Sequence, residues 1–228
     1  MHTNPIDMFL EWYKLASACP DIKIPEAMSL STVLGGQPDS RMVLLKSIDE
    51  RGFVFYTNIE SPKGQALLEN PRACLLFYWE PLGRQVRIRG YTERTESKFF
   101  EPILTTYMVA QKRISKWLHQ KETPSDKTVA EDKQSDSYFT TRSRESQIGA
   151  WASQQSQVLD SQESFERQIQ DMEKHFEDQA VPRPPFWAGY RLIPHEVEFW
   201  TNKKHRYHER LLYVKKGDAE WGTSFLSP

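Results

Sequence analysis

Short strand-like runs occupy most of the chain between positions 27 and 95 and again after position 186, and in some of them, such as 27–34 and 84–89, apolar and polar residues alternate. Such alternation predicts extended strands with one face towards a core. In the first part the runs are AMSLSTVL (27–34), MVLLK (42–46), FVFYT (53–57), ACLLFYW (73–79) and QVRIRGYTE (85–93). In the second part they are FWAGYRLI (186–193), EVEFW (196–200), RLLYV (210–214) and a last segment near 220–225. The pattern therefore predicts a mainly β protein.

Apolar residues at helical spacing occur in fewer places. Residues 6–17 predict an amphipathic helix at the start of the domain. Ser61 followed by Pro62 is typical of a capped helix start, and we expect a short helix there. Another helix is expected over 161–178, where Asp160-x-x-Glu163 resembles a capping box.

The middle of the chain has a different composition from the strand-rich parts. Residues 96–120 have a roughly helical pattern, whereas residues 121–137 are polar and charged and contain nothing that could bury a face. We expect the polar stretch to be a mobile surface loop. Residues 96–137 are therefore predicted to be an insertion, and the barrel and active site are assigned to residues 27–95 and 138–228.

Many short strands, few helices and no regular βαβ alternation predict one domain over residues 1–228, an antiparallel barrel with flanking helices. The sequence has no G-x-G-x-x-G and no G-x-x-x-x-G-K-[ST], which argues against Rossmann and P-loop nucleotide sites. Hydrophobic residues make up 38% and charged residues 27%, the balance of a globular protein.

Charge and cysteine content exclude several partners. A net charge of −1 argues against a nucleic acid or an anionic membrane surface as a partner. Cys19 and Cys74 match no CxxC or zinc spacing, and the first residues are polar rather than signal-like. No apolar run approaches the roughly 20 residues that span a bilayer. We therefore expect a cytoplasmic protein without a metal.

Four stretches concentrate cations among the predicted strands. Arg41 and Lys46 bracket an apolar run, which fits either a ligand at a sheet edge or ordinary strand ends. Residues 84–89 predict a strand with a cationic outer face around Gln85, with a simple solvated face as the alternative. Residues 142–151 combine arginine and serine donors that suit a phosphomonoester, although they also fit a capped helix start.

The fourth stretch follows Trp200 and is predicted to place Arg206, His208 and Arg210 on one strand face. The spacing His205-x-x-His208 lacks the further ligands that zinc would need. No serine-histidine-acid or cysteine-histidine arrangement stands out either. The residues therefore indicate a site in which a bound cofactor performs the chemistry and the protein supplies binding and orientation.

Taken in order, these segments resemble the pyridoxine (pyridoxamine) 5′-phosphate oxidase family. The matching phrases are RMVLLK (41–46), FVFYTN (53–58), SPKG (61–64), NPRACLLFYWEPLGRQVRIRG (70–90), SRESQIGAWASQQS (143–156) and FWAGYRLIPHEVEFWTNKKHRYHERLLY (186–213). The resemblance implies an FMN-binding split β-barrel that forms a homodimer, with FMN at the subunit interface. It also implies oxidation of pyridoxine or pyridoxamine 5′-phosphate to pyridoxal 5′-phosphate by O2, which yields H2O2 and, from the amine, ammonia.

The resemblance also implies a set of site residues. Those for FMN are Arg41, Met42, Val43, Leu44, Leu45, Lys46, Tyr56, Thr57, Lys63, Gln85, Gln155, Ser156, Trp200 and Arg210. Those for the substrate are Lys46, Tyr138, Arg142 and Ser146 around its phosphate, together with Arg206 and His208. The last two are also implied to be catalytic, because they would lie over the pyridine ring and the carbon that is oxidised.

Three features depart from the family pattern. Pro62 stands where the family usually has arginine, which removes one cation from the FMN phosphate; the stretch from Gly90 to Tyr138 is longer; and the N-terminal arm is short or missing. Three alternatives stay open: a flavin oxidase for another substrate, such as the phenazine-pathway relatives, a non-catalytic FMN or pyridoxal phosphate binder, and a basic-faced interaction protein without a cofactor.

Overall fold

The alternating segments form an antiparallel sheet in the computed structural model, which describes residues 2–95, 133–217 and 220–228. The strands of this part of the chain are β1 Ala27–Leu34, β2 Gln37–Leu44, β3 Ser47–Asp49, β4 Gly52–Asn58, β5 Arg72–Trp79, β6 Arg84–Arg94, β7 Trp187–Thr201, β8 Glu209–Lys215 and β9 Trp221–Phe225. The helices are α1 Pro5–Ala18, α2 Pro62–Glu69, α5 Lys133–Thr140, α6 Arg144–Ala152 and α7 Gln162–His175, with short 3-10 turns η1 Glu80–Leu82 and η2 Lys204–Arg206.

The sheet is not closed into a complete barrel. Its strand order is β2-β1-β5-β6-β7-β4-β3, with β8 paired to β7 and β9 paired to β8. No ladder joins β2 to β3 or β4 in the described part of the chain. The prediction of a mainly antiparallel β fold with flanking helices is confirmed, while the barrel stays open between β2 and β4.

The long strand β7 joins the two halves of the sheet. Its residues 187–192 pair with β4, and residues 196–201 pair with β8 along the same edge, because β6 occupies the other edge. The sequence pattern predicts two strands separated near Pro194, and this prediction is wrong. The ladder with β6 shifts register between Arg89 and Gly90, where Gly90 is opposite Pro194. Such a bulge lets the strand continue through Pro194, which has no backbone N–H to donate.

Helix α1 fills one side of the sheet, as the helical spacing over 6–17 predicts. Asn4 caps its start by accepting a hydrogen bond from the backbone N–H of Ile6 at 2.9 Å. The ring of Phe9 is fully buried, and its centroid lies 4.9 Å from those of both Phe53 and Phe77 in edge geometry. These contacts make α1 part of the main core. Burial of one such ring contributes about 1.5–3 kcal/mol to the free energy of unfolding.

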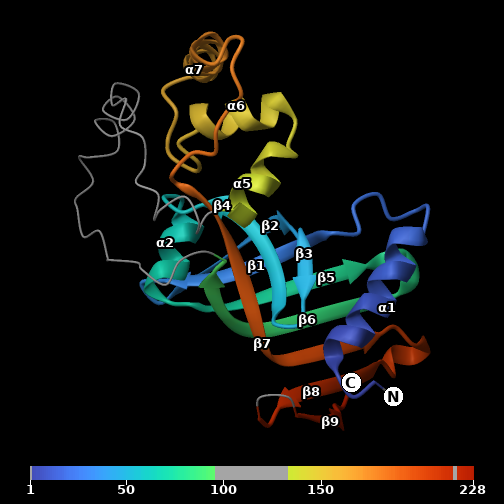
Figure 1. Cartoon of the computed structure of the whole chain (residues 1–228). Helices are drawn as coiled ribbons and strands as arrows, with labels where there is room; N and C mark the ends of the chain where they lie inside the picture. Colours follow the sequence, from blue (N-terminus) through green and yellow to red (C-terminus); the bar gives the residue numbers. More distant parts are fainter. Residues whose placement is uncertain (1, 96–132, 218–219) are drawn as a thin grey trace.

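Helices α5, α6 and α7 form a separate group at one end of the sheet, whereas the two termini lie near β8 at the other end (Figure 1). Phe139, Ile148, Trp151 and Phe176 make a second hydrophobic cluster with Trp187 at the start of β7. A further link between the helices and β7 comes from a single arginine. Arg183 donates to Asp136 Oδ1 and to the carbonyl oxygen of Trp187, both at 2.6 Å. The group is thereby fixed next to β4 and β7.

Two local predictions need correction. Residues 133–137 are not a loop but the start of α5, where Ser135 is fully buried; the predicted helical pattern and the rest of the loop lie outside the described residues. Helix α7 begins at Gln162, one residue later than expected, because Ser161 rather than Asp160 caps it. The Ser161 hydroxyl accepts from the backbone N–H of Ser164 at 3.1 Å, and the Ser164 hydroxyl accepts in return from the backbone N–H of Ser161 at 3.4 Å.

Candidate active site

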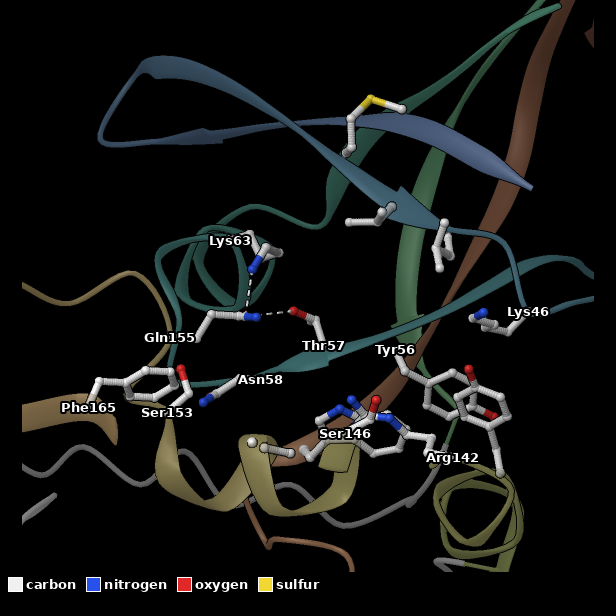
Figure 2. Close-up of a pocket in the computed structure, with 17 residues that line it drawn as sticks. Lys46, Tyr56, Thr57, Asn58, Lys63, Arg142, Ser146, Ser153, Gln155 and Phe165 are labelled. Atoms are coloured by element: carbon white, nitrogen blue, oxygen red, sulfur yellow. Dashed lines mark hydrogen bonds between the residues drawn. The ribbon is translucent and has the colours of Figure 1, made fainter. Parts of the chain in front are cut away.

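A cavity of about 550 Å³ lies where the sheet is open, between strands β2 and β4 on one side and helices α5 and α6 on the other (Figure 2). It brings together residues that are distant in sequence. The predicted site residues that line it are Met42, Val43, Leu44, Lys46, Tyr56, Thr57, Lys63, Tyr138, Arg142, Ser146 and Gln155. Residues predicted to bind FMN and residues predicted to bind the substrate therefore meet at the opening in the sheet.

One end of the cavity is formed by Lys63 in the first turn of α2. Ser61 caps this turn by accepting from the backbone N–H of Gly64 at 3.3 Å. A Cβ on Gly64 would lie 2.3 Å from the carbonyl oxygen of Ile59, so only glycine allows the helix to start this close to β4. The sequence prediction of a helix beginning at Ser61 and Pro62 is confirmed, and it places Lys63 at the cavity wall.

The ammonium group of Lys63 is buried among neutral partners. It donates to Oε1 of Gln155 at 2.7 Å and to Oγ of Ser61 at 3.3 Å, and Thr57 also reaches Gln155 at 3.4 Å. The pKa of Lys63 is lowered to about 8, mainly by burial and to a smaller extent by the nearby positive charge of Arg41. A buried cation held by neutral groups favours an anionic ligand, such as the phosphate of FMN.

Arg41 is next to this end but does not line the cavity. Its guanidinium forms an ion pair with Asp39 and donates to Oγ1 of Thr32 at 2.8 Å and to the carbonyl oxygen of Leu30 at 3.1 Å. The same contact holds the pKa of Asp39 below its usual value. Arg41 thus adds positive charge near Lys63, while its own side-chain contacts are with β1 and with Asp39 of its own strand.

The other end of the cavity contains Lys46, Arg142 and Ser146. Burial lowers the pKa of the Arg142 guanidinium, and its Nη1 atom is buried without a hydrogen-bond partner among the described residues. The guanidinium also lies 5.3 Å from the ring centroid of Trp187. An orphaned buried donor next to a second cation is the arrangement that an anionic group of a ligand would complete.

The two interpretations of residues 142–151 are compatible. Ser143 caps α6 by accepting from the backbone N–H of Ser146 at 3.3 Å, which is the capped helix start. Arg142 and Ser146 also line the cavity. The cap fixes the first turn of α6, so the helix start serves to orient the residues that were predicted to bind phosphate.

A stack of aromatic rings forms the wall between the sheet and the helices. The ring of Tyr56 on β4 lies 4.8 Å from Trp187 at an interplanar angle of 8°, and 4.4 Å from Tyr138 of α5 at 22°. The ammonium group of Lys46 lies 5.7 Å from the Tyr138 ring. These flat surfaces can contact a planar ligand inside the cavity.

A second set of predicted residues lies together at a different place. Gln85, Trp200 and Arg210 are direct cross-strand neighbours on β6, β7 and β8, and we call these three residues the strand row. The ring of His208 lies 4.6 Å from that of Trp200. Arg84 lies 4.5 Å from Trp12 of α1, so Gln85 and its row lie on the sheet face away from α1. None of these residues lines the cavity.

Several predicted positions differ from expectation. Arg206 and His208 do not share a strand face with Arg210, because Arg206 ends turn η2 with a φ of 62° and β8 begins only at Glu209. Leu45 is buried in the main core, and Ser156 is exposed in the loop after α6 with a φ of 65°. None of these four residues lines the cavity within one chain.

Sequence reasoning missed some residues of the cavity wall. These are Asn58, Gly149, Ala150, Ser153, Phe165 and Trp187. Asn58 follows the predicted residues Tyr56 and Thr57 directly, so its position in the sequence was a usable signal, whereas Trp187 has no predicted site residue beside it. Phe165 was assigned only to the apolar stripe of its helix, and periodicity has no means of showing that one side chain of a stripe lines a cavity.

The described part of the chain shows neither a metal site nor a helix that could span a membrane. The described residues contain no group of three or more histidine, cysteine, aspartate or glutamate side chains that could hold a metal ion. Among the described helices, we find none with the length and apolar character that a membrane crossing requires.

Comparison with known families and proteins relates the chain to pyridoxamine 5′-phosphate oxidases. The family model described as pyridoxamine 5′-phosphate oxidase matches residues 21–133, and the model of the pyridoxine 5′-phosphate oxidase C-terminal dimerisation region matches residues 187–228. A pyridoxine/pyridoxamine 5′-phosphate oxidase of Nostoc punctiforme is 41% identical over 228 residues, which cover 99% of this chain and 89% of that protein. The one of Caulobacter vibrioides is 43% identical over 226 residues, covering 99% and 85%.

Solved structures agree with this assignment. PhzG from Burkholderia lata, in complex with tetrahydrophenazine-1-carboxylic acid, matches with a TM-score of 0.78 and 29% identity over 100% of this chain and 94% of that chain. An FMN-binding protein of Nostoc punctiforme related to pyridoxamine 5′-phosphate oxidase shares the fold, with a TM-score of 0.65, 15% identity and full coverage of both chains. The chain belongs to the pyridoxine/pyridoxamine 5′-phosphate oxidase family.

Proposed function

We propose that this protein is an FMN-dependent oxidase that converts pyridoxine 5′-phosphate or pyridoxamine 5′-phosphate into pyridoxal 5′-phosphate. The main support is the presence of cations at both ends of one cavity, with Lys63 at one end and Lys46 and Arg142 at the other (Figure 2). Two phosphates, one from FMN and one from the substrate, would complete the two ends.

The residues at the Lys63 end fit the cofactor. Lys63 and Gln155 would bind the FMN phosphate region, and Thr57 and the β2 segment 42–44 would line the flavin. When bound, FMN would supply the redox chemistry, passing the two electrons and two protons that the substrate loses on to O2, which becomes H2O2.

The residues at the other end fit the substrate. Lys46, Arg142 and Ser146 would hold its phosphate, and Tyr138 would contact its ring or phosphate from α5. A fixed phosphate at this end would orient the pyridine ring along the cavity towards the flavin. Such positioning is a large part of the rate enhancement that an enzyme with a bound cofactor can supply.

We further propose that a second copy of the chain completes the site. The cavity contains none of Gln85, Trp200, Arg206, His208 and Arg210. All of them except Gln85 lie within the region that matches the family's dimerisation region. A homodimer would bring these residues of one protomer to the cavity of its partner, where Arg206 would orient the substrate and stabilise negative charge on the flavin. His208 would orient the substrate or exchange a proton with it.

One alternative has a specific observation in its favour. The similarity to PhzG, together with the aromatic stack of Tyr56, Trp187 and Tyr138, fits an oxidase of a reduced phenazine carboxylate. A carboxylate has one negative charge and two oxygens, whereas a phosphate has more of both. The cluster of Lys46, Arg142 and Ser146 therefore favours the phosphorylated pyridine.

An anaerobic spectrum tests the proposal. The purified protein is saturated with FMN, freed of excess, and its visible spectrum is recorded before and after pyridoxine 5′-phosphate. We expect a retained flavin band that bleaches with substrate and returns with air. Bleaching only by tetrahydrophenazine-1-carboxylic acid would support the alternative, and failure to retain FMN under any condition would refute both flavin oxidases.

A further inference from the structure

Arg210 of the strand row is held in place by two contacts within its own chain. Its Nε donates to Oε1 of Glu198 at 2.8 Å, and its Nη1 donates to the carbonyl oxygen of Ser227 at 2.9 Å. The backbone also ties these segments together, because the N–H of Leu226 donates to the carbonyl oxygen of Arg210 at 2.9 Å. These bonds use Nε and Nη1 and leave the Nη2 amino group for a ligand.

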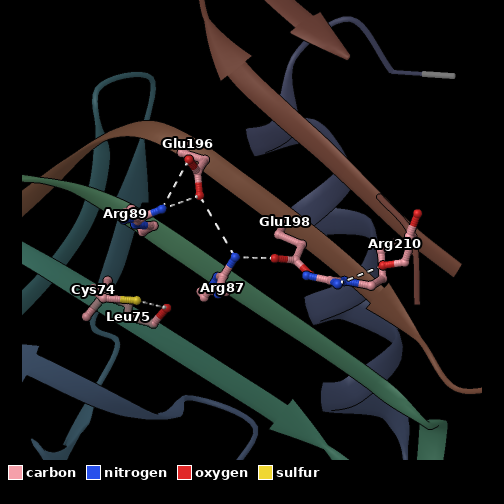
Figure 3. A network of polar contacts seen from close by, with 8 residues as sticks. Cys74, Leu75, Arg87, Arg89, Glu196, Glu198 and Arg210 are labelled. Atoms are coloured by element: carbon pink, nitrogen blue, oxygen red, sulfur yellow. Dashed lines mark hydrogen bonds and ion pairs between the residues drawn. The ribbon is translucent and has the colours of Figure 1, made fainter. Parts of the chain in front are cut away.

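Glu198 lies one row away from the strand row and is shared by two arginines. It is the direct neighbour of Arg87 on β6, and its second oxygen forms an ion pair with that residue (Figure 3). Only 4% of its side chain is exposed. Replacing a buried ion pair by apolar residues of similar size is often neutral or stabilising, so the need to fold does not by itself explain a carboxylate here.

The adjacent pair offers a direct contrast. Glu196 contacts Arg89 at 3.1 Å in the next row of the same three strands and Arg87 at 4.0 Å, but it has no contact with Arg210 (Figure 3). Its side chain is more exposed, at 20%. The two glutamates thus share strand, charge and an arginine partner, and they differ in whether they touch the arginine that we assign to FMN.

We propose that Glu198 is a positioning residue, which fixes the guanidinium of Arg210 so that it is preorganised to bind FMN in a site formed with a second copy of the chain. This inference rests on the proposed function. A guanidinium that is already fixed loses less side-chain freedom when it binds, so the contact with Glu198 increases affinity without touching the ligand.

The test is a titration of the full-length apoprotein with FMN, followed by quenching of flavin fluorescence. We expect Glu198→Gln to raise the Kd for FMN about tenfold and Glu196→Gln to change it less than about twofold. Arg210→Ala should raise the Kd at least as much as Glu198→Gln. Adding Glu198→Gln to Arg210→Ala should then have no further effect, because Glu198 acts through Arg210.

Each outcome decides a separate point. An unchanged Kd in Glu198→Gln, an equal effect of Glu196→Gln, or additive effects in the double variant would refute the positioning role. If wild-type protein binds no FMN, the proposed function fails together with this inference. Should Glu198→Gln fail to fold, removal of Ser227 and Pro228 deletes the other contact of Arg210. An increased Kd there supports a preorganised Arg210, and an unchanged Kd overturns the inference.

Discussion

The cavity and the strand row both contain arginine or lysine residues, but the two regions treat these cations in opposite ways. In the cavity, Lys63 is held by neutral oxygens and Arg142 has a buried donor without a partner among the described residues. In the strand row, Arg210 is bound to the carboxylate of Glu198, which also binds the neighbouring Arg87. The cavity therefore has cations that an anionic ligand would pair with, whereas the arginine of the strand row is already paired with a carboxylate.

The difference indicates that the two regions have separate roles within one site. Cations without anionic partners provide binding energy to a phosphate when it enters. Cations that are already paired gain less from an added anion, but they keep a fixed geometry. We infer that the cavity determines which anions bind, and that the strand row and η2 contribute orientation from the second protomer.

The largest expected effect comes from variants in which the cavity is altered in one protomer and the region around the strand row in the other. Arg206→Ala should lower turnover roughly a hundredfold while changing the Kd for FMN far less, since its charge acts on the reacting atoms. Arg142→Ala should be nearly inactive at low substrate concentration. An equimolar mixture of the two variants, unfolded and refolded together, should regain about a quarter of wild-type activity, because half of the dimers are mixed and each has one intact site.

A mixture of two cavity variants, Arg142→Ala and Lys46→Ala, is the matched control and should regain nothing. Recovery in this control, or none in the first mixture, would show that the cavity and the strand row do not share a site across the interface. Equal losses of turnover and FMN affinity in Arg206→Ala would instead make Arg206 a flavin ligand.

The second effect concerns the substrate end of the cavity. Arg142→Ala should raise the KM for pyridoxine 5′-phosphate ten- to hundredfold, as expected for the loss of about 1.5–3 kcal/mol from a hydrogen bond to a charged group. The preference for this substrate over pyridoxine should fall by the same factor. Arg144→Ala is the control, because Arg144 donates to the carbonyl oxygens of Phe176 and Gln179 and does not line the cavity. Equal KM changes in both variants would contradict the assignment.

The strands and helices near these regions could largely be predicted from sequence, because they depend on local periodicity and capping. Segment 27–34 was identified by alternation, 53–57 and 73–79 were identified as short strand-like runs, and Ser61 and Pro62 correctly marked the start of α2. The role of residues 41–46 was only partly visible from their order. Leu45 is buried in the core, whereas Met42 and Leu44 line the cavity. The phrase RMVLLK alone does not distinguish these positions.

The grouping of the site residues needed the structure, since it depends on contacts between distant segments. Lys63 and Gln155 meet across 92 residues, and the strand row exists because of the register among three strands. Sequence patterns contain no information on such registers unless a short turn fixes them. The left-handed conformation of Arg206 was hidden for another reason: it occurs at a non-glycine residue, where no sequence signal marks it.

The third effect tests the position that departs from the family. Pro62 precedes Lys63 at the start of α2, beside the end of the cavity that we assign to the FMN phosphate. Pro62→Arg should lower the Kd for FMN about tenfold by adding a cation there. Pro62→Ala is the control, because it removes proline from the helix start without adding a charge. It should leave the Kd for FMN nearly unchanged. Equal affinities of the two variants would place the phosphate elsewhere.

The smallest effect is a pH dependence that only the cavity should show. Because the pKa of Lys63 is lowered to about 8, its ammonium form is complete well below pH 8 and is lost as the pH rises through this value. The FMN phosphate is already a dianion in this range, since its second pKa is near 6. Binding above pH 8 must then be coupled to uptake of a proton by Lys63, so the Kd should rise roughly tenfold between pH 7 and pH 9.

Two variants attribute this pH dependence to Lys63. Lys63→Arg keeps its charge throughout the range, so its Kd should stay flat between pH 7 and pH 9. Lys63→Gln should bind weakly and also without pH dependence. Glu198→Gln, which perturbs only the strand row, should have a higher Kd but the same slope as wild type, because it leaves Lys63 unchanged. A flat wild-type profile, or a slope that persists in Lys63→Gln, would show that the phosphate does not bind next to Lys63, and the contrast between the two regions would then fail.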